Sequence, residues 1–303
     1  MAKKVNASSG RMPTRIAGLT LGIAIGVAGA VHFAPNDELE LAQSELSSTS
    51  EQLRIAQATN ASNEAYIGAS GPMIVANKLF NLPVIVMTTS DAKEEDVAAV
   101  EGLLENAGIV KSGRIALQPS FFAQDTADQL NNVVTQTLPA GVQISTTKLD
   151  PGTHAGEVLG AALLPATNPA DRGLVLNALI AAGFIEADLP AIVPTANIIL
   201  ITGDGDVLGY PADALAAFAQ GMEDQGSQVV LAGRIHTAAD GGAIDQLRKS
   251  TEAGRRPSTV DNISTPVGRI ATVLASAEQT KGEGGAYGIA ASASAVCPPF
   301  VLS

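Results

Sequence analysis

The chain is acidic and long enough for one large or two small domains. It has 303 residues, a formal net charge of −12 and one cysteine, Cys297. This charge opposes binding to nucleic acid and to anionic lipid surfaces, so we expect no nucleic-acid partner. A single cysteine excludes an intramolecular disulfide. Tryptophan is absent and aromatic residues make up 3% of the chain, so the core must be aliphatic and rich in alanine.

An uncharged segment of 19 residues, 16–34, predicts a transmembrane helix. At about 1.5 Å per residue it covers about 28 Å, close to the thickness of a bilayer's hydrocarbon core. Four basic residues precede the segment and every acidic residue follows it. The positive-inside rule then leaves residues 1–15 as a cytoplasmic tail and exports the rest. We therefore expect a single-pass protein of the inner (plasma) membrane, with its bulk in the periplasm-like envelope space.

The alternative for this segment is a cleaved signal peptide. Ala28, Gly29 and Ala30 have the small-x-small form of a cleavage site. The apolar run is longer than the usual signal-peptide core of about 7–15 residues, which favours a retained anchor.

Small residues recur within the predicted span. Gly18, Gly22 and Gly26 are four residues apart, which places them on one face of a helix, where another helix can approach closely. This face is predicted to pack the anchor against a partner or against its own copy. The alternative is that glycine is simply common in membrane helices.

Residues 35–66 predict a helical stalk. Leu39, Leu46 and Leu53 are seven residues apart, the spacing of one core position in a coiled coil. The second core position carries the small residues Ala42, Thr49 and Ala56. Two stalks in one membrane have a high effective concentration, which favours a dimer through these leucines. The pattern equally fits a single amphipathic helix that lies on its own domain.

Residues 72–285 predict an exported α/β domain. Gly71 and Pro72 form a pair typical of a helix end. Strands are predicted at 84–88, 114–117, 198–202 and 228–232, and helices at 91–106, 123–138, 156–164, 171–184, 211–224 and 266–279. Strands that alternate with helices indicate a parallel or mixed sheet with flanking helices. Residues 286–303 are expected to form a flexible tail.

The best candidate for a catalytic or metal site follows the predicted strand 198–202. The segment GDGD at 203–206 nearly matches the glycine fingerprint of dinucleotide-binding proteins, and its aspartates are similar to a magnesium-binding DxD motif. Aspartates oppose a bound phosphate, and the next helix begins only at Pro211, too late to direct its N-terminus there. A magnesium site needs further carboxylates. We interpret the segment as a turn, and leave to the structure whether Asp204 and Asp206 line a cleft.

Other chemical signals are weak. The sequence has no HExxH, GxSxG or CxxC motif. His154 and His236 are isolated, and His32 lies at the outer edge of the predicted span. We therefore expect a protein that is not an enzyme, with no catalytic residues, no assigned metal site and no resident cofactor.

Three segments near the C-terminus carry a resemblance to a known family. They are STVDN at 258–262, TPVGRIATVL at 265–274 and GAYG at 285–288. Together with the anchor, the stalk and the strand region 81–87, they resemble the MctB family, an actinobacterial family named for copper transport. Corynebacterial members are also called SteB and act with SteA in the control of daughter-cell separation. The resemblance covers nearly the whole chain and implies either copper handling at the envelope or regulation of a peptidoglycan hydrolase.

The exported part offers few copper ligands. Copper(I) favours thiolate and thioether ligands, and copper(II) favours imidazole. The candidates beyond the two isolated histidines are Cys297, Met73, Met87 and Met222, and none has ligand spacing. A pore needs several spans or a closed barrel of longer strands, and one span is predicted.

We therefore expect a non-enzymatic, membrane-anchored scaffold. Its expected partners are a second copy paired through the stalk, a SteA-like protein at the membrane and a peptidoglycan hydrolase outside. The alternative function is MctB-like copper transport or copper homeostasis across the mycolate envelope, in which copper is bound.

Overall fold

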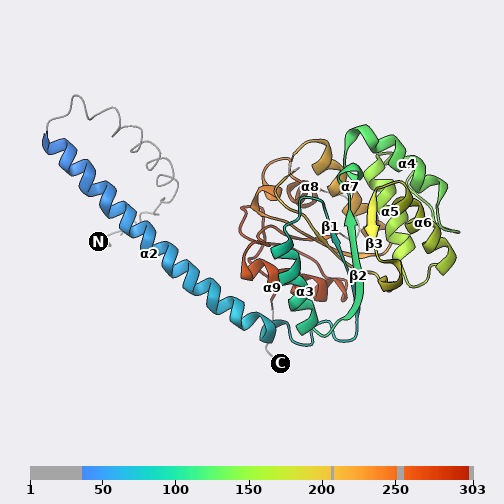
Figure 1. The fold of residues 1–303 in the computed structure, drawn as a ribbon, viewed down its shortest axis with the longest axis horizontal. Helices are drawn as coiled ribbons and strands as arrows, with labels where there is room; N and C mark the ends of the chain where they lie inside the picture. The colour runs from blue at the N-terminus through green and yellow to red at the C-terminus, as the bar shows by residue number, and fades with distance from the viewer. Residues whose placement is uncertain (1–35, 206–207, 251–255, 300–303) are drawn as a thin grey trace, which may run out of the picture. The chain divides into compact units, whose positions relative to one another are not determined.

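The computed structural model describes residues 36–205, 208–250 and 256–299 (Figure 1). The chain divides into two compact units, Met1–Asn63 and Glu64–Ser303. The predicted tail and transmembrane helix, with Gly18, Gly22 and Gly26, lie outside the described residues. None of the described helices has the length and apolar character needed to cross a bilayer.

The second unit is built on a sheet that has seven strands in the described residues, in the order β3-β2-β1-β4-β5-β6-β7. The strands are β1 (Pro83–Thr88), β2 (Val110–Leu117), β3 (Ile185–Ala187), β4 (Asn197–Ile201), β5 (Gln228–Ala232), β6 (Ser258–Val260) and β7 (Ala286–Tyr287). Neighbouring strands are parallel except β2 and β3, which are antiparallel. The predicted α/β class with a parallel or mixed sheet is confirmed.

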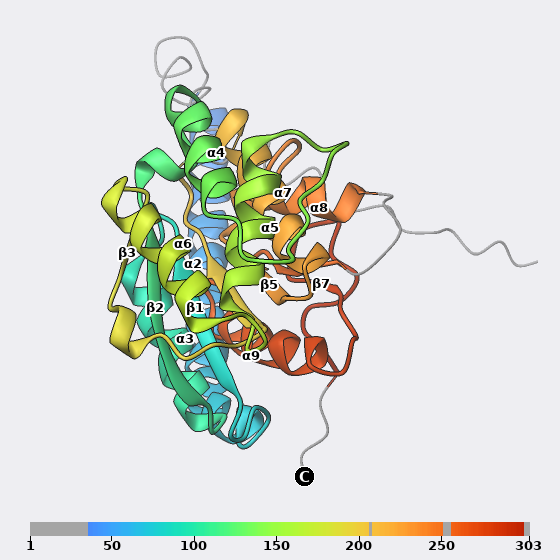
Figure 2. The ribbon, with the colours of Figure 1, turned by 90° about the vertical axis from the view of Figure 1, so that its right-hand side faces the viewer.

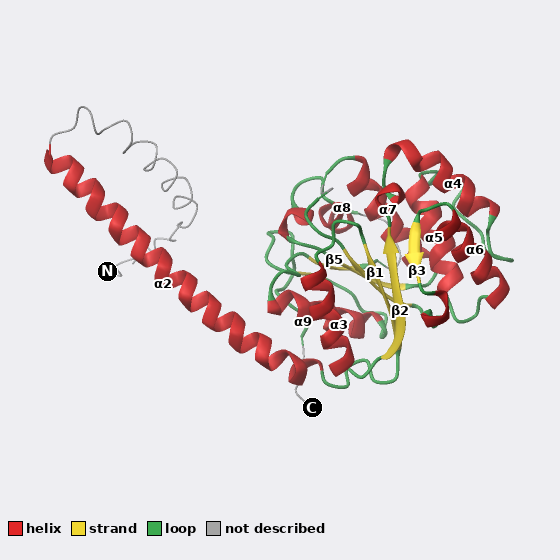
Figure 3. Ribbon diagram, in the orientation of Figure 1, coloured by secondary structure: helices red, strands yellow, loops and turns green. Residues whose placement is uncertain are grey.

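Helices cover both faces of the sheet (Figure 3). One layer contains α3 (Glu94–Asn106), α9 (Pro266–Gln279) and the end of α2 (Asn36–Val75). The other layer, seen face-on in Figure 2, contains α4 (Ala127–Gln136), α5 (Pro151–Leu163), α6 (Pro169–Ala181), α7 (Tyr210–Asp224) and α8 (Ala243–Lys249). Loops contain the short 3-10 helices η1 (Pro119–Phe121), η2 (Gln124–Thr126), η3 (Leu189–Ala191) and η4 (Ile235–Ala238).

The central strands supply side chains to both layers. In β1, Ile85 and Met87 join the core under α4–α8, whereas Val84 and Val86 join the core under α3 and α9. A parallel sheet covered on both faces needs apolar residues at successive positions. This explains why the central strands are continuous apolar runs in the sequence.

Three helices begin with a capping residue followed by proline. Asp150 accepts a hydrogen bond from the Thr153 N–H at 2.7 Å at the start of α5. Asn168 and Thr265 cap α6 and α9 in the same way. The side-chain oxygen satisfies a free N–H of the first turn, and the fixed φ of proline suits the first helical position. These local signals place the starts of the three helices.

Helix α2 continues beyond the stalk predicted at 35–66. It passes through Gly71 and Pro72, where the sequence predicts an end, and stops at Val75. Gly71 is buried against side chains of α3 and α9, and Val75 is fully buried. This tertiary packing outweighs the low helix propensity of a glycine–proline pair.

Helices α5 and α7 pack backbone against backbone. Gly152, Gly156 and Gly160 form a stripe on α5, and a Cβ atom at any of them would overlap the backbone of α7. At Gly156 the overlap is with the carbonyl oxygen of Phe218. Every residue of α5 from Gly152 to Leu163 is buried, so this helix forms part of the core.

The sheet ends in a short strand at each edge. At one edge the three-residue strand β3 pairs with one end of β2, and the Val193 N–H donates to the Ser112 carbonyl further along β2. At the other edge the Ser294 N–H donates to the Ala286 carbonyl of β7. Strand β7 begins at Ala286, so the sheet extends past the domain end predicted at residue 285.

A buried ion pair closes the sheet beside β7. Arg248 at the end of α8 and Asp261 after β6 lie 2.8 Å apart, with side chains 4% and 0% exposed. Arg248 also donates to the Tyr287 carbonyl, and Asp261 accepts from the Ile289 N–H. Gly288 has φ +132°, and a Cβ there would overlap the Asp261 carboxylate. Two of the C-terminal segments that carry the family resemblance, 258–262 and 285–288, therefore meet here.

Gly156→Ala is expected to destabilise the domain by about 1–3 kcal/mol, because the added methyl group forces α5 away from α7. Urea unfolding of the purified chain, followed by circular dichroism, measures the change. Gly102→Ala is the matched control, since an added Cβ in this part of α3 has nothing within 4 Å. It should instead gain about 0.5–1 kcal/mol from helix propensity. Equal effects of the two changes would contradict the close contact.

Arg248→Met is expected to cost about 3–5 kcal/mol, because Asp261 would keep a buried charge without its partner. Lys111→Met is the control, since Lys111 and its partner Glu105 have side chains 76% and 53% exposed and such pairs contribute little. Urea unfolding again gives both values. A loss at Arg248 no larger than the loss at Lys111 would show that the ion pair does not hold this edge.

Candidate functional site

The sheet has a topological switch point between β1 and β4. Strand β1 is followed by β2 on one side, whereas β4 is followed by β5 on the other side. In open α/β sheets, ligands bind outside the carboxyl ends of the strands at such a point. The two loops concerned follow Thr88 and Ile201, and the second includes the GDGD segment.

The crevice at this switch point is filled by the protein itself. Asp91 Oδ2 accepts a hydrogen bond from the Gly205 N–H at 2.7 Å, and Asp91 Oδ1 accepts one from Thr89 Oγ1 at 2.5 Å. A Cβ at Gly203 would overlap the Asp91 carbonyl, so glycine allows the two loops to touch. The cavity left between the loops measures about 20 Å³. The GDGD segment thus begins as a turn that packs against the neighbouring loop.

Charges around the crevice also oppose a bound phosphate. The first turn of α3 carries Glu94, Glu95 and Asp96, where a dinucleotide-binding fold presents free N–H groups to phosphate. Asp96 is 1% exposed and lies 2.9 Å from Arg234 and 2.8 Å from Arg269. These ion pairs join the start of α3 to α9 and to the loop after β5. Arg234 and Arg269 therefore stabilise the fold by pairing with Asp96 and are not free to bind a phosphate.

The structure brings Asp204 next to His236. Asp204 Oδ1 lies 3.2 Å from His236 Nδ1, and their side chains are 32% and 69% exposed. Arg234 Nη1 lies 3.9 Å from the other carboxylate oxygen of Asp204. Asp206 lies outside the described residues. The sequence left this histidine isolated, yet both residues follow the carboxyl ends of β4 and β5, which are neighbouring parallel strands.

Most of the other candidate ligands are occupied or buried, whereas Met73 is 72% exposed. His154 is 6% exposed, with Nδ1 2.9 Å from Asn131 Oδ1 and Nε2 3.1 Å from the Ser145 carbonyl. Met87 and Met222 are fully buried in the core. Burial raises the pKa of the Cys297 thiol, which keeps it protonated and a poor metal ligand at neutral pH.

In the part of the chain that the structure describes, no group of three or more His, Cys, Asp or Glu side chains lies close enough to hold a metal ion.

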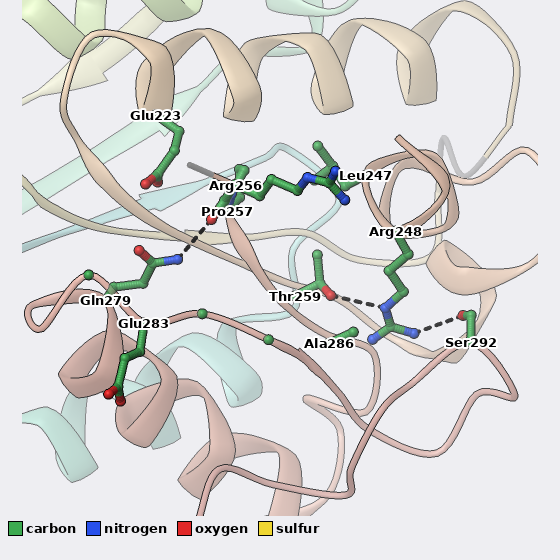
Figure 4. A pocket seen from close by; sticks show the side chains of 13 residues that line it. Glu223, Leu247, Arg248, Arg256, Pro257, Thr259, Gln279, Glu283, Ala286 and Ser292 are labelled. Atoms are coloured by element: carbon green, nitrogen blue, oxygen red, sulfur yellow. Dashed lines mark hydrogen bonds between the residues drawn. The ribbon is translucent and has the colours of Figure 1, made fainter. Parts of the chain in front are cut away.

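A polar pocket of about 450 Å³ lies at the amino ends of β6 and β7 (Figure 4). Its charged lining residues are Glu223, Arg248, Arg256 and Glu283. Figure 4 shows Arg248 directed toward Thr259 and Ser292, with both glutamates at the other side. The pocket is therefore lined by both positive and negative side chains. One of its two arginines, Arg248, already forms the buried ion pair with Asp261.

The stalk leaves its leucines exposed. Leu46 and Leu53 are 45% and 56% exposed, and the side chain of Leu39 lies outside those described. Leu41 and Ile55 are 65% and 53% exposed. At about 100° per residue, Leu41 and Ile55 lie about 150° around the helix from Leu46 and Leu53. Pairing through the predicted leucine seam stays a prediction.

Comparison with known proteins gives a consistent result. A family model described as "Copper transport outer membrane protein, MctB" matches residues 15–298. The chain is 34% identical to the Copper transporter MctB of Mycobacterium tuberculosis (strain ATCC 25618 / H37Rv) over 216 residues, which cover 68% of this chain and 69% of that protein. It is 33% identical to the Copper transporter MctB of Mycobacterium leprae (strain TN) over 241 residues, which cover 75% and 76%. The chain therefore belongs to the MctB family, as the resemblance of its C-terminal segments predicts.

Proposed function

We propose that this protein serves copper transport or copper homeostasis in the cell envelope. The observation that carries the proposal is the family match over residues 15–298, together with relatives named copper transporters. The proposal places copper first and the anchored scaffold second, the reverse of the order expected from the residues alone.

The packing of the α/β domain supports a role for its surface. Apolar side chains fill the space between the sheet and the helices on both faces, as in a close-packed protein interior. In this proposal the predicted helix 16–34 holds the domain outside the plasma membrane. Copper is then bound at the domain surface and passed on to other components of the envelope.

Deletion of the gene is expected to change both the copper content of the cells and their growth in added copper. Elemental analysis of washed cells measures copper, with zinc and iron as internal controls. The full chain supplied in trans should restore the original copper content, and the direction of the change distinguishes export from uptake. Copper content and copper tolerance that both stay unchanged would contradict the proposal.

A second function, the anchored scaffold, is favoured by the exposure of α2. The described side chains of residues 41–63 are exposed apart from Thr49, which is partly buried. This stretch includes SSTS at 47–50, a run of low helix propensity. Helices gain most of their stability from tertiary packing, so such a helix benefits from a partner.

The residues beside the leucine seam permit self-pairing. These positions carry Gln43, Glu45, Ser50, Gln52, Gln57 and Thr59, and like charges across the seam are therefore few. In this second proposal the stalks form a dimer that positions a SteA-like protein at the membrane and a peptidoglycan hydrolase outside.

Changing Leu46 and Leu53 together to Asp is expected to abolish self-association, because each charge would be buried in the seam. Light scattering of the purified full-length chain in detergent measures the mass, and circular dichroism checks the α/β domain. The matched control changes Leu41 and Ile55 to Asp, which adds the same charge on another side of the helix. Association that survives the first change, or is lost equally in both, would remove the leucine seam from the mechanism.

A further inference from the structure

The histidine–aspartate pair after β4 and β5 carries a more specific inference. We propose that His236 and Asp204 bind Cu²⁺ in an exchangeable site at the carboxyl edge of the sheet. The choice of metal rests on the proposed copper function, whereas the site rests on the placement of these two side chains.

Hydrogen bonds fix the two loops that carry Asp204 and His236. Strands β4 and β5 are parallel neighbours in which Ile201 lies opposite Ala232, so their following loops leave the sheet side by side. The loop of Asp204 is tied to the loop after β1 by the bond from the Gly205 N–H to Asp91. His236 lies within η4, where Thr237 Oγ1 donates to the Arg234 carbonyl at 2.6 Å. The two ligands are therefore presented together without a rearrangement of the fold.

The distance between the two atoms suits a shared metal ion. Two ligands that are each about 2.0 Å from a first-row metal, at about 90° to each other, are roughly 2.8 Å apart. His236 Nδ1 and Asp204 Oδ1 are 3.2 Å apart, so a small side-chain rotation brings both to a metal. Nitrogen and oxygen ligands are those that Cu²⁺ accepts in tetragonal sites.

The charged groups around Asp204 leave its carboxylate available. Asp91 lies on the adjoining loop, whereas Glu95 and Asp96 at the start of α3 are paired with Arg234, and Asp96 also with Arg269. The nearest cation, Arg234, bonds to Glu95 at 2.6 Å and to Asp96 at 2.9 Å, closer than its 3.9 Å approach to Asp204. The carboxylate of Asp204 thus keeps a face toward the imidazole and solvent.

The coordination explains why the site would exchange its metal. Two protein ligands leave the remaining positions of Cu²⁺ to water, which a further ligand can displace. The other described histidine, His154, has both ring nitrogens engaged in hydrogen bonds within the fold. Such a site suits the transfer of copper between carriers better than its storage.

The test is a titration of the tag-free, full-length chain with Cu²⁺ alone, in detergent, followed by electron paramagnetic resonance. The wild-type chain is expected to bind Cu²⁺ with a signal that shows nitrogen coordination. His236→Asn should remove that signal, and Asp204→Asn should weaken binding by roughly tenfold or more. The matched control is Asp240→Asn, since the Asp240 side chain is 95% exposed and pairs with Lys249. It should bind as the wild type does.

Each outcome separates the site from the copper function. Unchanged Cu²⁺ binding in His236→Asn, or equal losses in Asp204→Asn and Asp240→Asn, overturns the site. A wild-type chain that binds no Cu²⁺ also overturns it, even if the deletion strain shows altered copper content. Specific binding at the pair, with normal copper content in the deletion strain, supports the site and rejects the copper function. Circular dichroism of each variant confirms that loss of binding is not loss of folding.

Discussion

The fold depends on the burial of both faces of a parallel sheet in a chain that has few aromatic side chains. Strands β1 and β4 are apolar at successive positions, and their central residues are almost completely buried. Small and branched aliphatic residues fill a core only if the elements come close together. The glycine stripe of α5 makes this possible on one face, where Phe121, Phe184 and Phe218 gather as a cluster with edge-to-face rings. Gly71 has the same effect for α2 on the other face.

Close packing also changes what the switch point can do. In a dinucleotide-binding fold the loops at this point separate to admit phosphates. Here Asp91 bonds to Gly205 across the gap, and acidic residues at the start of α3 are neutralised by arginines from elsewhere in the chain. The site resembles that of an α/β enzyme in topology, but it presents carboxylates and one imidazole. This chemistry is better suited to a metal cation than to a nucleotide.

Elements with strong local signals were predictable from the sequence. The apolar runs predicted the central strands, and the helix at 266–279 was predicted with its observed bounds. Strands β3, β6 and β7 have two or three residues, too few for a periodic pattern. The predicted end of α2 at Gly71–Pro72 was wrong, because the burial of Val75 outweighs the tendency of a glycine–proline pair to end a helix.

The candidate site was only partly predictable for a related reason. The turn at Asp204 follows from glycine content, and its partner follows from strand order, which places the loop of His236 beside it. The strand order itself depends on contacts that no local pattern encodes. The pairing of Arg248 with Asp261 depends in the same way on the packing of α8 against β6. Sequence motifs read one at a time do not predict that packing.

The edges of the sheet restrict how copies of this protein can meet. An open strand edge invites addition of a strand from another molecule, and natural sheets avoid this with very short edge strands or by covering the edge. Here the edge strand β3 has three residues, and the segment that includes Ser294 folds back on β7 at the other edge. Neighbouring molecules would therefore remain separate folded domains rather than merge into a continuous sheet. Contacts between them would have to form through side chains, which mutation can tune without endangering the fold.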